Sequence, residues 1–322
     1  MANNLDIELG IKTTNGAITP AVLEGITWTT ERRGVPGKLT FNCLFDENNI
    51  FEEGDLVTVK YKGQKVFYGF IFRISRDRDN ILSVTAYDQL RYLKNKDVYQ
   101  YRNKKASEVL TMLANDFKLQ LGEIEDTKFI IPKRLEDNVS LFDMILTALG
   151  ITLQNTKKMY VLYDDFGKLT LKDVENMKLN ICIDSSTSEN FSYTSSIENS
   201  ANKILIYEET PNGAGKRIAA HEIDEENIKK WGVLQKIDIL KEKENGKMKA
   251  DALLQLYNRK FKSLSIKNVF GDVRVRAGSS IIVVLDLGDV KVSNYMLVES
   301  AKHIFNNQEY LMDLILRGAD IQ

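Results

Sequence analysis

The stretch FEEGDLVTVKYKGQKVFYGFI, from Phe51 to Ile71, alternates apolar and polar residues on both sides of a Lys62-Gly63 turn. Gly54 precedes the first alternating run. Alternation with a period of two indicates a strand that buries one face, and two such runs around a glycine turn are typical of a β-hairpin. The stretch therefore predicts a hairpin in a β-rich fold, and it contains no cluster of reactive side chains.

The same order of features occurs a second time near the end of the chain, in VRAGSSIIVVLDLGDVKVSNYMLVESAKHIFNNQEYLMDLILRG. Gly278 precedes a strand as Gly54 does, and an aromatic residue, Tyr68 or Tyr295, lies early in the second strand. A polar turn and a closing strand follow in both copies. We interpret the pattern as an internal duplication. Chance is the alternative, because many β proteins contain strand–glycine–strand runs.

Residues 1–93 contain six β-rich runs separated by polar turns. The runs are Asp6–Thr13, Ile26–Thr30, Lys38–Phe45, Leu56–Tyr61, Lys65–Ser75 and Ile81–Asp88. Short strands at this density predict a small barrel or sandwich.

The apolar period changes near Lys94, and residues 94–175 predict a compact α+β module. In NKKASEVLTMLANDF the apolar residues recur at helical spacing. A second helix is predicted in NVSLFDMILTALG, with Ser140 as its N-cap, Asp143 in its first turn and Gly150 at its end. FIIPKRL lies between the helices, and a hairpin around Asp164–Gly167 follows them.

Residues 176–322 begin with serine-rich sequence that predicts an extended loop or an irregular strand. Strands are then predicted over Lys203–Glu209, Arg217–Glu222 and Val233–Lys241. A short helix is predicted between Asp224 and Gly232, and a longer helical insertion at about 247–262. The last sixty residues or so return to β. The predicted fold class is mainly β with an α+β insertion: two β-barrels, 1–93 and 176–322, flank the α+β domain 94–175.

The composition is that of an ordinary globular protein without a strong electrostatic preference. Forty-four basic residues face 45 acidic ones, and the net charge of −1 gives no general attraction to nucleic acid or anionic membranes. The N-terminal sequence lacks a secretory signal, and no apolar run is long enough for a transmembrane helix. Cys43 and Cys182 are expected to be two buried thiols in a reducing compartment rather than a disulfide.

Several segments match part of a known catalytic or binding motif but lack residues that the motif requires. HEIDE places His221 and Glu222 as in a zincin helix, but Glu225 stands where the second histidine is required. With His303 as the only other histidine, two surface histidines are the better interpretation. The segment Asn212–Lys216 lacks the first glycine and the Ser or Thr of a phosphate loop, so a hairpin turn is expected there.

Carboxylates are abundant, but no segment marks two of them as partners in a cleft. The acidic clusters Glu52-Glu53, Asp164-Asp165 and Asp224–Glu226 lie in predicted turns or at a helix start, where solvation explains them. No serine or cysteine has a positioned base. We therefore predict no enzyme activity, no catalytic, cofactor-binding or metal residues, and no cofactor.

Four blocks of the sequence carry a family resemblance. They are VLEGITWTTERRGVPGKLTFNCL, KASEVLTMLANDF with NVSLFDMILTALG, DEENIKKWGVLQ, and VRAGSSIIVV with YMLVESAKHIFNNQEYLMDLILRG. In this order they resemble the baseplate hub proteins of the XkdQ/YqbQ type, from contractile phages, prophages and phage-tail-like bacteriocins. More distant relatives are the late control D proteins and the hub part of type VI secretion spike proteins. The resemblance spans nearly the whole chain.

The resemblance implies two barrels similar to the tail tube protein, with the α+β domain between them. It implies a homotrimer whose six barrels form a ring, line the channel and adapt a threefold spike to a sixfold tube. Implied partners are the tail tube or tube-initiator protein, the central spike or tip protein, other baseplate proteins and the tape measure protein, with no membrane or specific nucleic-acid binding. The implied location is the baseplate of a virion or tail-like particle, assembled in the host bacterial cytoplasm.

Two alternatives of another class stay open at this point. One is a tail-associated peptidoglycan hydrolase, and the other is a cell-wall-binding module. A hydrolase would clear a cell-wall suspension, whereas a binding module would bind the wall without clearing it. The resemblance does not distinguish a phage from a genome-free bacteriocin particle.

Overall fold

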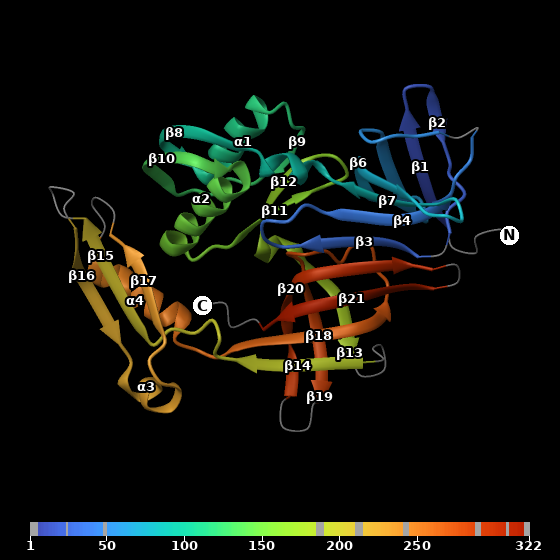
Figure 1. Ribbon diagram of the computed structural model, residues 1–322. Helices are drawn as coiled ribbons and strands as arrows, with labels where there is room; N and C mark the ends of the chain where they lie inside the picture. The colour runs from blue at the N-terminus through green and yellow to red at the C-terminus, as the bar shows by residue number, and fades with distance from the viewer. Residues whose placement is uncertain are drawn as a thin grey trace. The chain divides into compact units, whose positions relative to one another are not determined.

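A computed structural model describes residues 6–23, 25–47, 50–184, 190–209, 215–240, 245–286, 291–306 and 309–318 (Figure 1). The chain forms two compact units, which are treated separately below. The first comprises Met1–Ser192 with Ser265–Ala319, and the second is built from Tyr193–Leu264. The mainly β fold with an α+β insertion, predicted from the sequence, is confirmed.

The first half of unit 1 is a seven-stranded array. Its strands are β1 (Ile7–Thr13), β2 (Gly16–Ile18), β3 (Ile26–Glu31), β4 (Lys38–Leu44), β5 (Leu56–Tyr61), β6 (Gln64–Arg76) and β7 (Ile81–Tyr87). They pair in the order β3-β4-β7-β6-β5-β1-β2. Alternate side chains, such as Leu39 and Phe41 of β4, point into one core while their neighbours lie outside. The period-two pattern of the sequence thus becomes one buried and one polar sheet face.

The other half of the array comes from the C-terminal part of the chain. Its strands are β13 (Lys178–Asp184), β18 (Phe261–Phe270), β19 (Ser280–Asp286), β20 (Lys291–Phe305) and β21 (Tyr310–Arg317). β18 neighbours β21, β21 pairs with β20, and β20 also pairs with β19 and with β3. β14 (Asn190–Ser196) lies next to β18, and the border between the two units falls within β14 and β18.

The predicted repeat has matching backbone geometry in both copies. Gly54 and Gly278 have φ values of 97° and 96°, a region that glycine enters without steric cost. The Gly54 N–H donates to the Ile71 carbonyl and the Gly278 N–H to the Val298 carbonyl, each over 2.8 Å. A register irregularity follows at once, between Ile71 and Arg73 or between Val298 and Ser300.

The long strands β6 and β20 behave alike in the two repeats. Each pairs with the preceding strand along its first half and with the following strand along its second half. The two repeats thus share the register irregularity and the division of strand partners as well as the order of features in the sequence.

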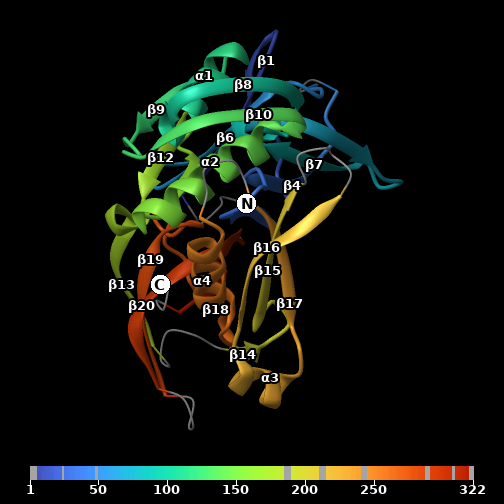
Figure 2. The same cartoon turned by 90° about the vertical axis from the view of Figure 1, so that its left-hand side faces the viewer.

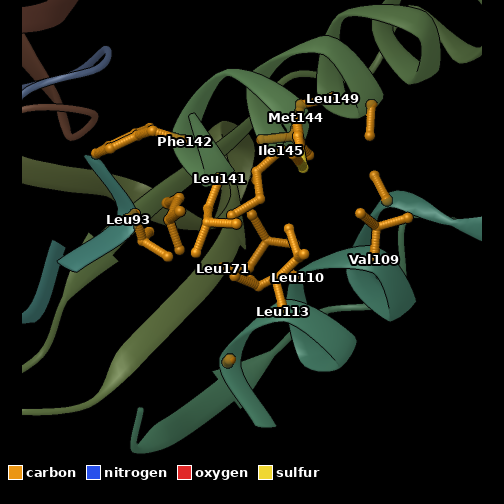
Figure 3. Close-up of a cluster of buried hydrophobic side chains, with 14 of the residues drawn as sticks. Leu93, Val109, Leu110, Leu113, Leu141, Phe142, Met144, Ile145, Leu149 and Leu171 are labelled. Atoms are coloured by element: carbon orange, nitrogen blue, oxygen red, sulfur yellow. The ribbon is translucent and has the colours of Figure 1, made fainter. Parts of the chain in front are cut away.

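The α+β module lies in unit 1 between the two repeats in sequence. Its elements are η1 (Gln89–Lys94), β8 (Lys96–Lys105), α1 (Ala106–Asp116), β9 (Leu121–Ile124), β10 (Ile130–Ser140), α2 (Leu141–Thr156), β11 (Tyr160–Asp164), β12 (Leu169–Asp173) and η2 (Val174–Met177). β8 pairs with β10, and β12 lies between β11 and β9. Leu110 and Leu113 of α1 meet Leu141 and Ile145 of α2 over Leu171 (Figure 3), a core without exposed members.

Helix α2 begins as predicted but ends later than predicted. Ser140 is the N-cap, and its hydroxyl accepts from the Asp143 N–H over 3.1 Å. The expectation that Gly150 ends the helix is wrong, because the helix continues to Thr156 and ends at Lys157 in the left-handed conformation. Thr152, in the extra turn, is fully buried, so tertiary packing outweighs the weak helix propensity of glycine.

Unit 2 is a small three-stranded sheet with helices. Its elements are β15 (Lys203–Glu209), β16 (Lys216–Ile223), α3 (Glu225–Trp231), β17 (Gln235–Ile239) and α4 (Gly246–Tyr257), and the sheet order is β16-β15-β17. Ala250 and Leu253 of α4 pack on Ile204 and Ile206. Asp224 caps α3 as predicted, whereas α4 ends at Tyr257, before the predicted limit, because Phe261 already begins β18.

Candidate functional site

The candidate site is a continuous run of strands that crosses both repeats. The strand order β14-β18-β21-β20-β3-β4-β7-β6 joins four strands of the second repeat to four of the first. The join is the antiparallel pairing of β3 with β20, from Ile26 opposite Phe305 to Glu31 opposite Ser300 (Figure 1). One chain therefore presents two equivalent groups of strands side by side.

The run has an apolar buried face and an accessible face on which polar residues are mixed with apolar ones such as Ile315 and Phe270. On β3 the side chains of Ile26 and Trp28 are buried, whereas Thr27 and Thr29 lie on the accessible face. The other strands alternate in the same way. Further residues on the accessible face are Lys38, Thr40, Asn42, Ser83, Thr85, Ser300, Lys302, Asp313 and Arg317. Hydroxyl and amide groups and a few charged side chains make this face wettable.

By the internal repeat, β14 and the second half of β6 correspond to two strands that pair with each other elsewhere in the chain. In the second repeat β14 neighbours β18, as β3 neighbours β4 in the first. Likewise β20 neighbours β21, as β6 neighbours β7. Within the chain β3 pairs with the second half of β20. The counterparts of these two strands are β14, which ends the strand order, and the second half of β6, which extends past β5 although the order itself continues from β6 through β5 and β1 to β2. In the described ranges the ladder of β6 with β5 ends at Phe70, so Arg73–Arg76 pair with β7 alone.

An ion pair fixes the join between the repeats. The Arg32 guanidinium donates to both carboxylate oxygens of Glu299, each over 2.8 Å, and the Arg32 N–H donates to the Glu299 carbonyl over 3.0 Å. Burial alone would raise the pKa of Glu299, but the hydrogen bonds and charge of Arg32, with the charges of Arg33 and Arg317, hold it below its ordinary value. A bidentate pair of this kind restrains orientation as well as distance.

His303 lies in the core beside this join, so its predicted place on the surface is wrong. Its side chain is fully buried, stacks on Trp28 at a centroid distance of 4.6 Å, and its Nδ1 lies 2.7 Å from the Tyr310 hydroxyl. Burial lowers the pKa of His303 to about 3, which keeps the ring neutral. The alternation of Ala301, His303 and Phe305 could have revealed this, because all three point to the buried face.

Buried carboxylates lie where the α+β module meets the repeats. The Asp88 carboxylate accepts from the Gly37 N–H over 2.9 Å, and the Asp164 carboxylate accepts from the Gly167 N–H over 2.7 Å. The Arg276 guanidinium donates to the Asp164 carbonyl over 2.7 Å. Burial raises the pKa of Asp164 to about 6, and burial together with the Asp164 charge raises the pKa of Asp88 well above its usual range.

Solvation therefore does not explain Asp164, contrary to the expectation for that acidic cluster. The carboxylate is buried and structural: it holds the β11–β12 turn, while its carbonyl binds the segment before β19. The turn bond to Gly167 is local, but sequence spacing carried no signal for the contact with Arg276, which lies 112 residues away along the chain.

The zincin-like motif noted in the sequence does not assemble into a site among the described residues. His221 and Glu222 lie in strand β16 and Glu225 begins helix α3, so they do not form one helical face. The structurally described part of the chain holds no group of three or more His, Cys, Asp or Glu side chains able to bind a metal. None of its helices is long and apolar enough to span a membrane.

Two further sequence expectations have different outcomes. Cys43 is buried, and burial raises the pKa of its thiol to about 11, but Cys182 is exposed, so the expectation of two buried thiols is half wrong. Both cysteines are free. The predicted turn at Asn212–Lys216 falls largely outside the described residues.

The fold is one found in phage tail proteins. The crystal structure of the prophage MuSo2 43 kDa tail protein from Shewanella oneidensis superposes with a TM-score of 0.72 at 14% identity, covering 98% of this chain and 99% of that one. Residues 26–317 match the model of the YqbQ-like family, and the chain belongs to that family.

Two relatives from Bacillus subtilis (strain 168) are similar in sequence. The uncharacterized protein YqbQ is 27% identical over 301 residues, covering 91% of each chain. The phage-like element PBSX protein XkdQ is 27% identical over 273 residues, covering 81% of each. The sequence resemblance to this family is thereby confirmed.

Proposed function

We propose that this protein is the structural, non-enzymatic hub of a baseplate in a contractile phage tail or tail-like particle. Three copies form a ring whose six repeats adapt a threefold spike to a sixfold tube and line the channel. The hub is assembled in the bacterial cytoplasm. Family membership and the fold of tail proteins support a role in the tail. The finer assignment rests on the repeat.

The proposal rests on strands that are equivalent in the two repeats but differ in their pairing. Inside one chain β3 pairs with β20, while β14 ends the strand order and the second half of β6, in the described ranges, pairs with β7 alone. If β14 of one copy adds to β6 of the next, every join in the ring is of the same kind. Such heterologous contacts generate a closed ring when the rotation per step divides the circle.

The energy of such a join comes from strand pairing and apolar burial. Edge strands present unpaired backbone groups that readily accept another strand. The polar face with Thr29, Thr40 and Lys302 is suited to the channel side, because it contacts water or a passing chain without binding it strongly.

The test is the mass of the purified protein by light scattering, alone and with the spike and tube-initiator proteins proposed as its partners. We expect a complex with three copies of this chain. A monomer that binds neither neighbour contradicts the hub. In that case clearing of a cell-wall suspension would indicate the hydrolase, and sedimentation with the wall would indicate the binding module.

A further inference from the structure

The outward face of the β8–β10 pair carries two cations directly opposite each other. Arg102 and Lys133 are partners in the register of this pair, and both are exposed (β8 and β10 run side by side in Figure 2). Like charges directly opposite in a sheet destabilise it. In the parts of the chain that the structure describes, neither side chain forms an ion pair.

On the inward face of the same pair of strands, ion pairs compensate the positive charges. Arg134, next to Lys133, forms an ion pair with Glu136, and their side chains are 15% and 6% exposed. At the end of β8, Lys105 and Lys128 share Asp126 at 2.9 and 3.1 Å. The uncompensated repulsion is thus confined to the outward face.

Apolar side chains accompany the two cations. Leu135 is 63% exposed and lies opposite Gln100, and Val98 is 58% exposed two positions before Gln100. Exposed aliphatic groups beside an arginine form a composition found where proteins bind proteins. Asp97 and Asp137 lie exposed near the other end of the pair, so a long phosphate backbone would meet negative charge there.

We propose that this cationic ribbon face, made of Val98, Gln100, Arg102, Lys133 and Leu135, binds an acidic segment of a neighbouring baseplate protein. Carboxylates of the segment neutralise Arg102 and Lys133, and its apolar side chains cover Leu135 and Val98. Charge complementarity carries the choice of partner, because only an anion removes the repulsion. The neighbour being a baseplate protein rests on the proposed function, whereas the acidic chemistry does not.

The binding test uses the fluorescein-labelled synthetic peptide GELELEG and follows fluorescence polarisation with the full-length protein. We expect saturable binding that weakens by at least about tenfold in Arg102→Glu and in Lys133→Glu. Lys12→Glu, which reverses an exposed cation on strand β1, is the matched control and should bind like the unchanged protein. The neutral peptide GQLQLQG and a short DNA duplex should not bind.

A stability measurement tests the repulsion independently. Arg102→Glu turns the opposed pair attractive and should raise Tm by roughly 1 to 2 °C. The double variant Arg102→Glu/Lys133→Glu restores repulsion and should return Tm to its starting value. No binding of GELELEG, binding unaffected by the reversals, preference for DNA, or no rise in Tm for the single variant overturns the proposal.

Two measurements distinguish a failure of the proposed binding face from a failure of the proposed hub function. Light scattering of the Arg102→Glu variant reports ring assembly through β14 and β6, which belong to a different sheet from the β8–β10 pair. A trimer without peptide binding contradicts only the ribbon face, and peptide binding by a monomer contradicts only the hub.

Discussion

Gly54 and Gly278 occupy equivalent places in the two repeats but have different surroundings. A Cβ at position 54 would meet no atom within 4 Å, whereas one at 278 would lie 2.5 Å from Val161 Cγ1. Both residues have positive φ, which costs a non-glycine residue about 1–2 kcal/mol.

We expect Gly54→Ala to lower the free energy of unfolding by about 1 kcal/mol, and Gly278→Ala to lower it by a further 1 kcal/mol or more. Urea unfolding of both variants measures the difference. Because φ is nearly the same at both positions, each variant is the control for the other. Equal losses would show that Val161 moves aside without cost.

The carboxyl group of Asp164 makes stability depend on pH in a definite direction. Its ordinary pKa of 3.8 is raised to about 6 in the folded protein by burial. The folded state therefore holds the proton more tightly, and this contribution is full at low pH and lost as pH rises from about 4 to 6.

We expect Asp164→Asn to remove that part of the pH dependence, so that the Tm difference between variant and unchanged protein grows in the variant's favour across this window. Asn keeps an oxygen to accept from the Gly167 N–H. Thermal unfolding between pH 4 and 7 measures it, with Asp165→Asn as the neighbouring control. A constant difference would contradict the assigned pKa shift.

At the scale of elements, Gly150 shows that a residue of low helix propensity can lie inside a helix where tertiary packing is strong. It lies inside α2, its φ is not positive, and a Cβ there would meet nothing within 4 Å. Gly150→Ala should therefore stabilise the protein by about 0.5–1 kcal/mol, since it removes unfolded-state freedom at no steric cost. Chemical denaturation measures it, and a loss of stability would mean that α2 bends at this glycine.

Elements with a clear period were predictable from the sequence, and those defined by distant partners were not. The alternation over Leu56–Tyr61 and the stripe that includes Leu110 and Leu113 gave a strand and a helix where the structure has them. β8 was missed, because its charged residues hide the alternation of Tyr99 and Tyr101. The repeat was visible, but the pairing of β3 with β20 was not, because no local pattern encodes which edges meet.

At the scale of the whole molecule, the proposed ring requires β14 of one copy beside β6 of the next. In a Cys182→Ser background, we expect Ser75→Cys combined with Ser192→Cys or Thr194→Cys to yield a covalently linked trimer on oxidation. Cys43 is buried and stays out of the reaction. Non-reducing electrophoresis measures it.

The single-cysteine variants are the controls, since neither can link three chains. Absence of linked trimer from a sample that light scattering shows to be trimeric would exclude β14–β6 pairing and require another contact.

The covalent connection between the repeats has a kinetic consequence. The β3–β20 pairing forms when one chain folds, so it is a unimolecular event at the high effective concentration of a tether. In the proposed ring only every second contact then forms between molecules, and two encounters bring together what six separate subunits would need five to bring together. Fewer encounters leave fewer partial rings that compete for monomers, so assembly of the hub should reach completion at protein concentrations where an unlinked six-membered ring would stall.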